Sequence, residues 1–152
     1  MLNNSSIARI NKELCRDFSS ITYNCVLYHP NKRYIEINIT SDNNDIQFNI
    51  YPDYPFKSPK LLVNGKCYIT RHVNMYHKYN KILNILNYHK ECPCCDTILC
   101  NWSPANTLYQ LFEEYKNREI KYNKIKLVLT LNILKSQLPF DDYLHNKIIS
   151  YA

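Results

Sequence analysis

The feature that most constrains this fold is a change in the spacing of apolar residues along the chain. Near the N-terminus they recur every three or four residues, at Ile7, Ile10, Leu14, Cys15 and Phe18. This spacing is typical of an amphipathic helix. Charged side chains occupy its other faces, namely Arg9, Lys12, Glu13 and Arg16.

From Ile21 to Leu62 apolar residues alternate with polar ones, which predicts a three-strand antiparallel meander. The alternating positions are Tyr34, Ile35, Ile37 and Ile39, followed by Ile46, Phe48 and Ile50. A fourth strand is expected near Leu61 to Ile69. Before it, the segment Tyr51–Lys60 contains three prolines, which predict an ordered, extended loop.

The rest of the chain returns to helical spacing. After His72 the sequence favours at best a short helix around Ile82 to Leu86. Ser103 and Pro104 predict the start of a second helix, as its N-cap and first residue. The apolar face of that helix is Leu108, Leu111, Phe112 and Tyr115, and Ile125 to Ile149 is helical again, with Pro139 as a break. This order predicts an α+β fold in one domain spanning 1–152.

Composition narrows the class of protein. Seven cysteines, an odd number, and a polar N-terminus without an apolar signal segment predict reduced thiols in a cytoplasmic or nuclear protein. No apolar run approaches the length of a membrane span, so no membrane contact is expected. The formal net charge is +6, but the basic residues are scattered along the chain, so nucleic-acid binding is not expected either.

Four of the seven cysteines stand between Cys92 and Leu108, beside the only tryptophan. Thiols so placed are candidate nucleophiles or soft metal ligands. The candidate ligands of a structural zinc ion are Cys67, Cys92, Cys95 and Cys100, with His72, His77 or His89 nearby in sequence. Their spacing is not that of two Cys-x-x-Cys pairs, and zinc on Cys94 would stop it acting as a nucleophile. Cys15 and Cys25 are expected to be buried small apolar residues.

Three motifs in order make the chain resemble the ubiquitin-conjugating enzyme (E2) family. An Arg-Ile-x-Lys-Glu-Leu helix core is matched from Arg9 to Leu14. A Tyr-Pro-Phe-Lys-x-Pro-Lys loop is matched from Tyr54 to Lys60, and Trp-Ser-Pro-Ala-x-Thr from Trp102 to Thr107. The resemblance runs from Arg9 to about Tyr115. It implies the UBC-like fold, with an N-terminal helix, a four-stranded antiparallel meander and C-terminal helices.

The resemblance implies a nucleophile eight residues before the tryptophan, which is Cys94. Cys95 is the alternative, but it requires a one-residue deletion and puts Asp96 where an inward leucine is expected. Such a cysteine accepts ubiquitin or a ubiquitin-like protein as a thioester from an activating enzyme (E1). It passes the acyl group to a lysine or to a ligase (E3) cysteine, and the transfer needs no cofactor.

In the family an asparagine of a His-Pro-Asn triplet stabilises the oxyanion of the transfer. The counterpart here is Asn74, in His72-Val73-Asn74, which lies twenty residues before Cys94. The family spacing is about eight, so a family-atypical insertion is expected at about 75–91. Asn80 and Asn101 are weaker candidates, and a solvated turn residue is the alternative for Asn74.

Partner surfaces are implied as well. Phe56, Pro104 and Ala105 would contact a ligase, and Arg9, Lys12 and Arg16 would contact the activating enzyme, with a solvated helix face as the alternative. Trp102 is expected to anchor the core, and Asp141 and Asp142 are candidates to help deprotonate an incoming lysine. Two other functions stay open: a catalytically inactive module of this family that binds ubiquitin or a ligase, and a zinc-stabilised interaction protein on the same scaffold.

Overall fold

The chain begins with the predicted helix and continues into an antiparallel sheet, in a computed structural model that describes residues 4–26, 33–85 and 92–137. The elements are α1 (Asn4–Asp17), β1 (Tyr23–Val26), β2 (Ile35–Ser41), β3 (Asn44–Ile50), β4 (Lys60–Val63), β5 (Lys66–Cys67), α2 (Tyr68–Ile85), a 3₁₀ turn η1 (Cys94–Asp96) and α3 (Leu108–Gln137). The α+β class is confirmed. No helix in the described ranges is long and apolar enough to cross a membrane.

The sheet contains five strands in the order β1-β2-β3-β4-β5, and every neighbouring pair is antiparallel. The prediction of a single fourth strand is wrong, because that segment folds into the hairpin β4–β5. Asn64 and Gly65 form its turn with positive φ angles of 49° and 73°. Asn and Gly tolerate this left-handed conformation better than other residues, so the strand reverses at this point.

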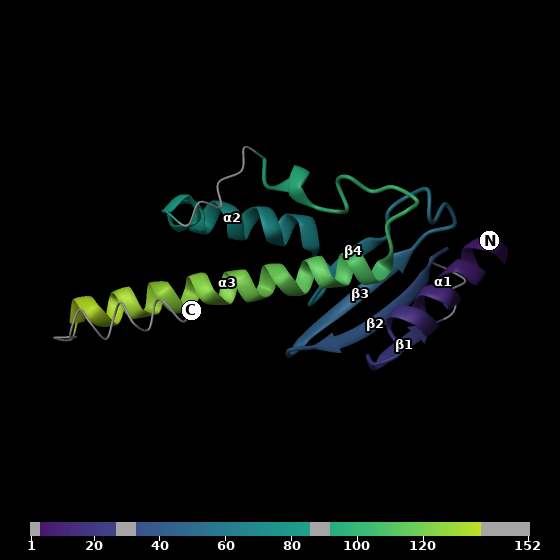
Figure 1. Cartoon of the computed structure of the whole chain (residues 1–152), viewed down its shortest axis with the longest axis horizontal. Coiled ribbons are helices and arrows are strands. Elements are labelled where there is room, and N and C mark those ends of the chain that lie inside the picture. Colours follow the sequence, from purple (N-terminus) through teal and green to yellow (C-terminus); the bar gives the residue numbers. More distant parts are fainter. Residues whose placement is uncertain (1–3, 27–32, 86–91, 138–152) are drawn as a thin grey trace.

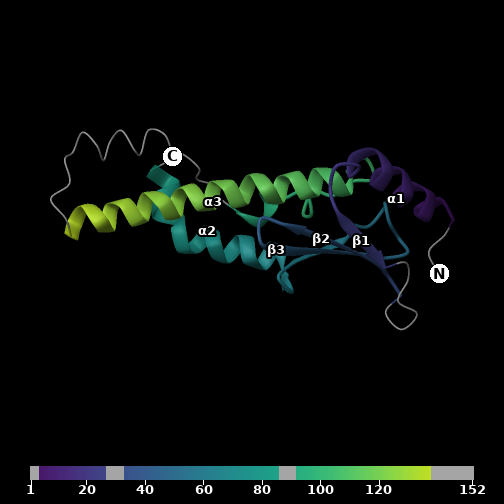
Figure 2. The same cartoon turned by 90° about the horizontal axis from the view of Figure 1, so that it is seen from below.

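The main core lies between one face of the sheet and the helices α1 and α3, which lie on the same side of the sheet (Figures 1 and 2). The alternation in β2 and β3 puts one set of side chains on this face, since Ile37 stands opposite Phe48 in the register. The buried sheet residues include Ile35, Ile37, Ile39, Ile46, Phe48 and Ile50, and the helices contribute Ile10, Leu14, Phe18, Leu108, Leu111, Phe112 and Tyr115.

Glu13 corrects the expectation that it would lie on the polar face of the first helix. Only 4% of it is exposed. Its carboxylate accepts hydrogen bonds from Arg9 Nε at 2.7 Å, from the Tyr54 hydroxyl at 2.8 Å and from the backbone N–H of Leu108 at 2.9 Å. These partners satisfy the buried charge. Glu13 therefore connects α1, the proline-rich loop and the first residue of α3.

The helix α2 is a second correction, because the sequence favoured only a short helix near its end. It spans 18 residues and leaves the edge of the sheet beside α3 (Figure 1). Its buried residues recur at Tyr68, His72, Tyr76, Tyr79 and Leu83, which is helical spacing carried mainly by aromatic rings. The expected insertion at about 75–91 coincides with the second half of α2 and with residues outside the described ranges.

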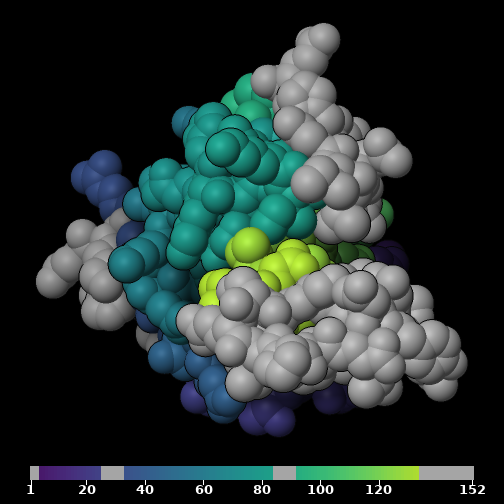
Figure 3. All heavy atoms as spheres, turned by 90° about the vertical axis from the view of Figure 1, so that its left-hand side faces the viewer, coloured from purple at the N-terminus to yellow at the C-terminus, as the bar shows by residue number. Residues whose placement is uncertain are grey.

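A small second core joins α2 to the distal part of α3. It consists of Tyr76, Tyr79 and Leu83 from α2, with Tyr122 and Ile125 from α3. Figure 3, which looks at the far end of the two helices, shows α2 (teal) lying directly against α3 (yellow). The two helices thus support each other beyond the sheet.

The start of α3 is a third correction, because the helix begins at Leu108 and not at Ser103. Thr107 Oγ1 accepts a hydrogen bond from the N–H of Gln110 at 3.2 Å, and the Gln110 side chain accepts one from the N–H of Thr107 at 3.0 Å. This reciprocal pair is a capping box. The helix then runs unbroken for 30 residues. Pro139, Asp141 and Asp142 lie outside the described residues.

Candidate functional site

The segment Cys92–Asp96, here called the cysteine turn, is fixed by side chains that bind its backbone. His72 Nε2 donates to Pro93 O at 3.0 Å, and Thr97 Oγ1 donates to Cys94 O at 2.8 Å. The amide of Asn101 donates to Cys95 O, and Arg118 Nη2 donates to Asp96 O at 2.6 Å. Side chains from α2, α3 and the loop after the turn therefore bind four successive backbone carbonyls of the turn.

His72 is the buried member of this set, with 4% of the residue exposed. Its Nδ1 accepts a hydrogen bond from the Tyr122 hydroxyl at 2.7 Å. Burial lowers the pKa of His72 to about 4, and the adjacent guanidinium of Arg118 contributes to the shift. The imidazole is thus neutral at physiological pH, and both ring nitrogens are engaged within the fold instead of being available to a metal.

Three thiols of the cysteine turn lie close together. The Sγ atoms of Cys92 and Cys94 are 2.8 Å apart, and those of Cys94 and Cys95 are 3.9 Å apart. All three lie within 4.8 Å of one another. Cys95 is exposed, and the other two are half-buried. This group differs from the predicted zinc set, because it includes Cys94 and does not include Cys67 or Cys100.

The three thiols ionise as one group. Hydrogen bonds from Cys94 and then from Cys95 lower the pKa of Cys92 to about 7. The contact with Cys92 raises the pKa of Cys94, and contacts with Cys92 and Cys94 raise that of Cys95 to about 12. The group therefore holds one thiolate near neutral pH, stabilised by two neighbouring thiols. Cys92, which the sequence placed in the candidate zinc set after Cys94 and Cys95 were preferred as nucleophiles, shares this charge.

The other cysteines have different surroundings. Cys67 precedes α2 and lines a cavity of about 210 Å³ with Leu99 and Pro59. Burial raises its pKa, but hydrogen bonds from Thr70 and Ile69 at the helix start outweigh burial and lower the pKa overall. Cys100 is exposed. Cys15 is exposed as well, contrary to the prediction, since the buried positions of α1 are Ser6, Ile10, Glu13 and Leu14.

The candidate asparagines are placed differently from one another. Asn74 and Asn80 lie within α2 and are exposed, so Asn74 is neither in a turn nor directly after a strand. The cause is the start of α2 at Tyr68, immediately after β5. Asn101 contacts the cysteine turn through Cys95 O and also donates to Thr97 O at 3.3 Å. An oxyanion role for Asn74 stays a prediction.

Trp102 joins the loop after the cysteine turn to the proline-rich loop. Its Nε1 donates to Pro55 O at 2.8 Å, and its ring packs 6.0 Å from that of Tyr54. The predicted core contact of Trp102 is confirmed. Next to this contact, Phe56 is 82% exposed.

The tip of the following loop is a turn closed by hydrogen bonds between Ser103 and Asn106. It leaves Pro104 and Ala105 exposed. Phe56, Pro104 and Ala105 are called the Phe56 surface below. An exposed aromatic ring can act as a recognition anchor for a partner.

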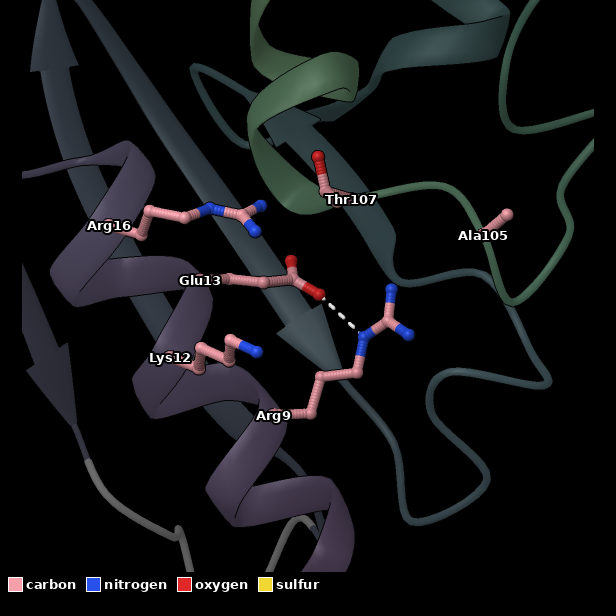
Figure 4. Close-up of a pocket in the computed structure, with 6 residues that line it drawn as sticks. All are labelled: Arg9, Lys12, Glu13, Arg16, Ala105 and Thr107. Carbon is pink, nitrogen blue, oxygen red and sulfur yellow. Dashed lines mark hydrogen bonds and ion pairs between the residues drawn. The ribbon is translucent and has the colours of Figure 1, made fainter.

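The predicted basic residues of α1 line a groove of about 340 Å³ together with Glu13, Ala105 and Thr107 (Figure 4). Arg9 is held at one end, since it pairs with Glu13 and donates to Asn106 O at 3.0 Å. Lys12 and Arg16 are exposed, and Arg16 also pairs with Asp17 at 2.5 Å. This basic groove can attract acidic side chains of a partner.

No family model, curated protein or solved structure matches this chain. The features that bear on function are its cysteine turn, its Phe56 surface and its basic groove.

Proposed function

We propose that the protein is a ubiquitin-conjugating enzyme of UBC-like fold that carries ubiquitin or a ubiquitin-like protein as a thioester on the cysteine turn. Cys94 is the proposed nucleophile and Cys95 its alternative. The observation that carries the proposal is a fixed turn of accessible thiols immediately before the Trp102 loop. This turn sits on a scaffold of N-terminal helix, antiparallel meander and long helix.

The chemistry proposed for the turn is acyl transfer. A thiolate attacks the thioester carbonyl on the activating enzyme, whose own cysteine leaves as a thiolate. A lysine amine then attacks the new thioester, a C–N bond forms, the C–S bond breaks and the amine loses a proton. The hydrogen bonds to the backbone carbonyls of the cysteine turn favour such a step, because they keep the nucleophile in one position. The amide of Asn101, at Cys95 O, is a polar donor already close to this turn.

The two surfaces support the same function. The Phe56 surface would contact a ligase, because it offers an apolar anchor on two loops that Trp102 joins. The basic groove would contact the activating enzyme through Lys12 and Arg16. Arg9 lines the same groove but stabilises the fold, since its guanidinium pairs with the buried Glu13.

The test is incubation with activating enzyme, ATP and ubiquitin, followed by gel analysis with and without reductant. The wild type should give an adduct that reductant removes. Cys94→Ser should lose it or convert it to an oxyester that resists reductant, whereas Cys15→Ser should behave as the wild type. If Cys92→Ser alone abolishes the adduct, the nucleophile is Cys92. The absence of any adduct in the wild type would reject catalysis with ubiquitin, and ubiquitin-like modifiers would then be tried in the same assay.

A catalytically inactive module of the same fold is the second candidate. The observation that favours it is α2, which occupies the segment where the family carries its oxyanion asparagine. Such a module would bind ubiquitin or a ligase without forming an adduct. Titration of labelled ubiquitin, monitored by NMR, separates the two functions, because reversible, saturable shifts of the ubiquitin signals without any adduct would support the module.

The third function suggested by the sequence, a zinc-stabilised interaction protein, has its support in the thiols of Cys92, Cys94 and Cys95, which could hold a metal ion. Cys67 and Cys100 stay predicted ligands without a place in that group.

A further inference from the structure

We propose that Cys92, Cys94 and Cys95 form a site for one thiophilic d¹⁰ cation, Zn²⁺ or Cu⁺, and that the bound cation blocks thioester formation. The metal site stands on the geometry of the thiols alone. The blocking effect rests on the proposed function, since it needs a nucleophile within the same group.

The distances between the sulfur atoms suit a single cation. With Zn–S bonds of about 2.3 Å in a tetrahedral site, two sulfur ligands stand about 3.8 Å apart. Cys94 and Cys95 are already at 3.9 Å, and Cys92 and Cys94 are at 2.8 Å. A cation among them therefore requires sulfur shifts of about 1 Å, within the reach of χ1 rotation.

The backbone beneath the thiols is fixed before any metal arrives. The carbonyls of Pro93, Cys94, Cys95 and Asp96 each accept a side-chain hydrogen bond. Arg118 and His72, which supply two of these bonds, come from α3 and α2 and are mostly buried. A preordered turn loses less conformational entropy when its side chains coordinate a metal. Cys92 and Cys94, and Cys94 and Cys95, are in direct sulfur contact above this backbone.

The charge balance of the site defines which cations fit. With all three sulfurs bound as thiolates, a Zn²⁺ site carries one net negative charge and a Cu⁺ site carries two. The guanidinium of Arg118, 3.5 Å from the Asp96 carboxylate, lies next to the turn and offsets part of this charge. Soft thiolate sets select zinc or Cu⁺ over hard cations such as Mg²⁺. Three ligands leave zinc one position for water, while Cu⁺ is satisfied by three sulfurs.

A metal on this group would remove the nucleophile, because a coordinated sulfur no longer offers its lone pair to a carbonyl. Cys94 lies in the middle of the group, within 4 Å of both neighbours. A cation bound by the three thiols therefore occupies the Cys94 sulfur directly. The segment would then act as a metal-controlled thiol.

The first experiment measures binding without any modifier. The reduced full-length chain is titrated with Zn²⁺, and separately with Cu⁺ under anaerobic conditions, and native mass spectrometry counts the ions bound. The wild type and Cys15→Ser should each bind one ion. Cys92→Ser should lose affinity by more than the roughly 10–100-fold that a change outside the ligand set causes. Equal affinity in Cys92→Ser and the wild type would overturn the site.

A second readout tests which thiols are ligands in the folded chain. Iodoacetamide labelling with peptide mass spectrometry should show Cys92, Cys94 and Cys95 protected by one equivalent of metal, while Cys15 and Cys100 stay reactive. Protection of Cys67 and Cys100 in place of Cys94 would overturn the proposal in favour of a different zinc set. This measurement separates loss of ligands from loss of folding in any variant.

The blocking effect is tested in the thioester assay, with one equivalent of metal per protein chain. Metal should suppress the wild-type adduct, and a chelator should restore it. The thioester of the activating enzyme itself, followed on the same gel, controls for metal acting on that enzyme. Metal binding without any adduct rejects the proposed function but not the site. An adduct that forms equally with saturating metal rejects the block.

Discussion

Glu13 is a single side chain on which three parts of the chain depend. Its carboxylate accepts from Tyr54, Arg9 and the first N–H of α3. We expect Glu13→Ala to lower the free energy of unfolding by about 3 kcal/mol or more, because it leaves these donors buried without an acceptor. Urea denaturation followed by circular dichroism measures the change.

The control for this prediction is Asp53→Ala, at a carboxylate that is 66% exposed and 3.7 Å from Lys57. A surface change of this kind should stay within about 0.5 kcal/mol of the wild type. Equal losses in the two variants would contradict the role assigned to Glu13.

His72 gives the chain a pH dependence of known sign. The pKa of His72 is about 4 in the folded chain, against an ordinary value of 6.5. Between these two pH values the imidazole is protonated in the unfolded state but stays neutral in the folded state. The contribution of His72 to the free energy of unfolding is therefore fully present above pH 6.5 and is lost as the pH falls towards 4. At roughly 1.4 kcal/mol for each pH unit, the loss is about 2 kcal/mol by pH 5.

Urea denaturation at pH 7 and pH 5 checks this prediction. His72→Gln should be less stable at pH 7 but should lose the part of the pH dependence that His72 causes. His77→Gln, at an exposed position of the same helix, should keep the wild-type pH dependence. An unchanged slope in His72→Gln would show that other groups cause it.

At the scale of elements, the start of α3 depends on the capping box of Thr107 and Gln110. Thr107→Ala should lower the free energy of unfolding by about 1 kcal/mol, since one N–H of the first turn loses its acceptor. Thr130→Ala, whose hydroxyl donates to Lys126 O on the exposed part of the same helix, should cost less than half as much. Thermal unfolding of the two variants in parallel gives the comparison.

Some helices and strands could be predicted from the sequence and others could not. Alternating isoleucines predicted β2 and β3, because a buried face of a sheet repeats every two residues. The helix α2 escaped notice because tyrosines and His72, which look polar in a sequence, supply most of its buried face. The strand β5 escaped because it has two residues, too few to show any period.

For the whole molecule, the order of helix, sheet and helices could be predicted, but not the contacts that bring distant segments together. The sequence placed Cys92 and Cys95 in one candidate zinc set with Cys67 and Cys100, whereas the fold groups them with Cys94. Their supports could not be predicted, because His72 lies 21 residues before Pro93 and Arg118 lies 22 residues after Asp96. Such pairings are set by how α2 and α3 pack, which no local pattern encodes.

The contact between Trp102 and Pro55 O gives the protein an intrinsic optical probe. Trp102 is the only tryptophan, so its fluorescence arises from a single place, where two loops meet beside Phe56. Emission from an indole shifts with the polarity around it. A partner that covers Phe56, or a change that separates the two loops, should therefore shift the emission wavelength of Trp102 in the unlabelled protein.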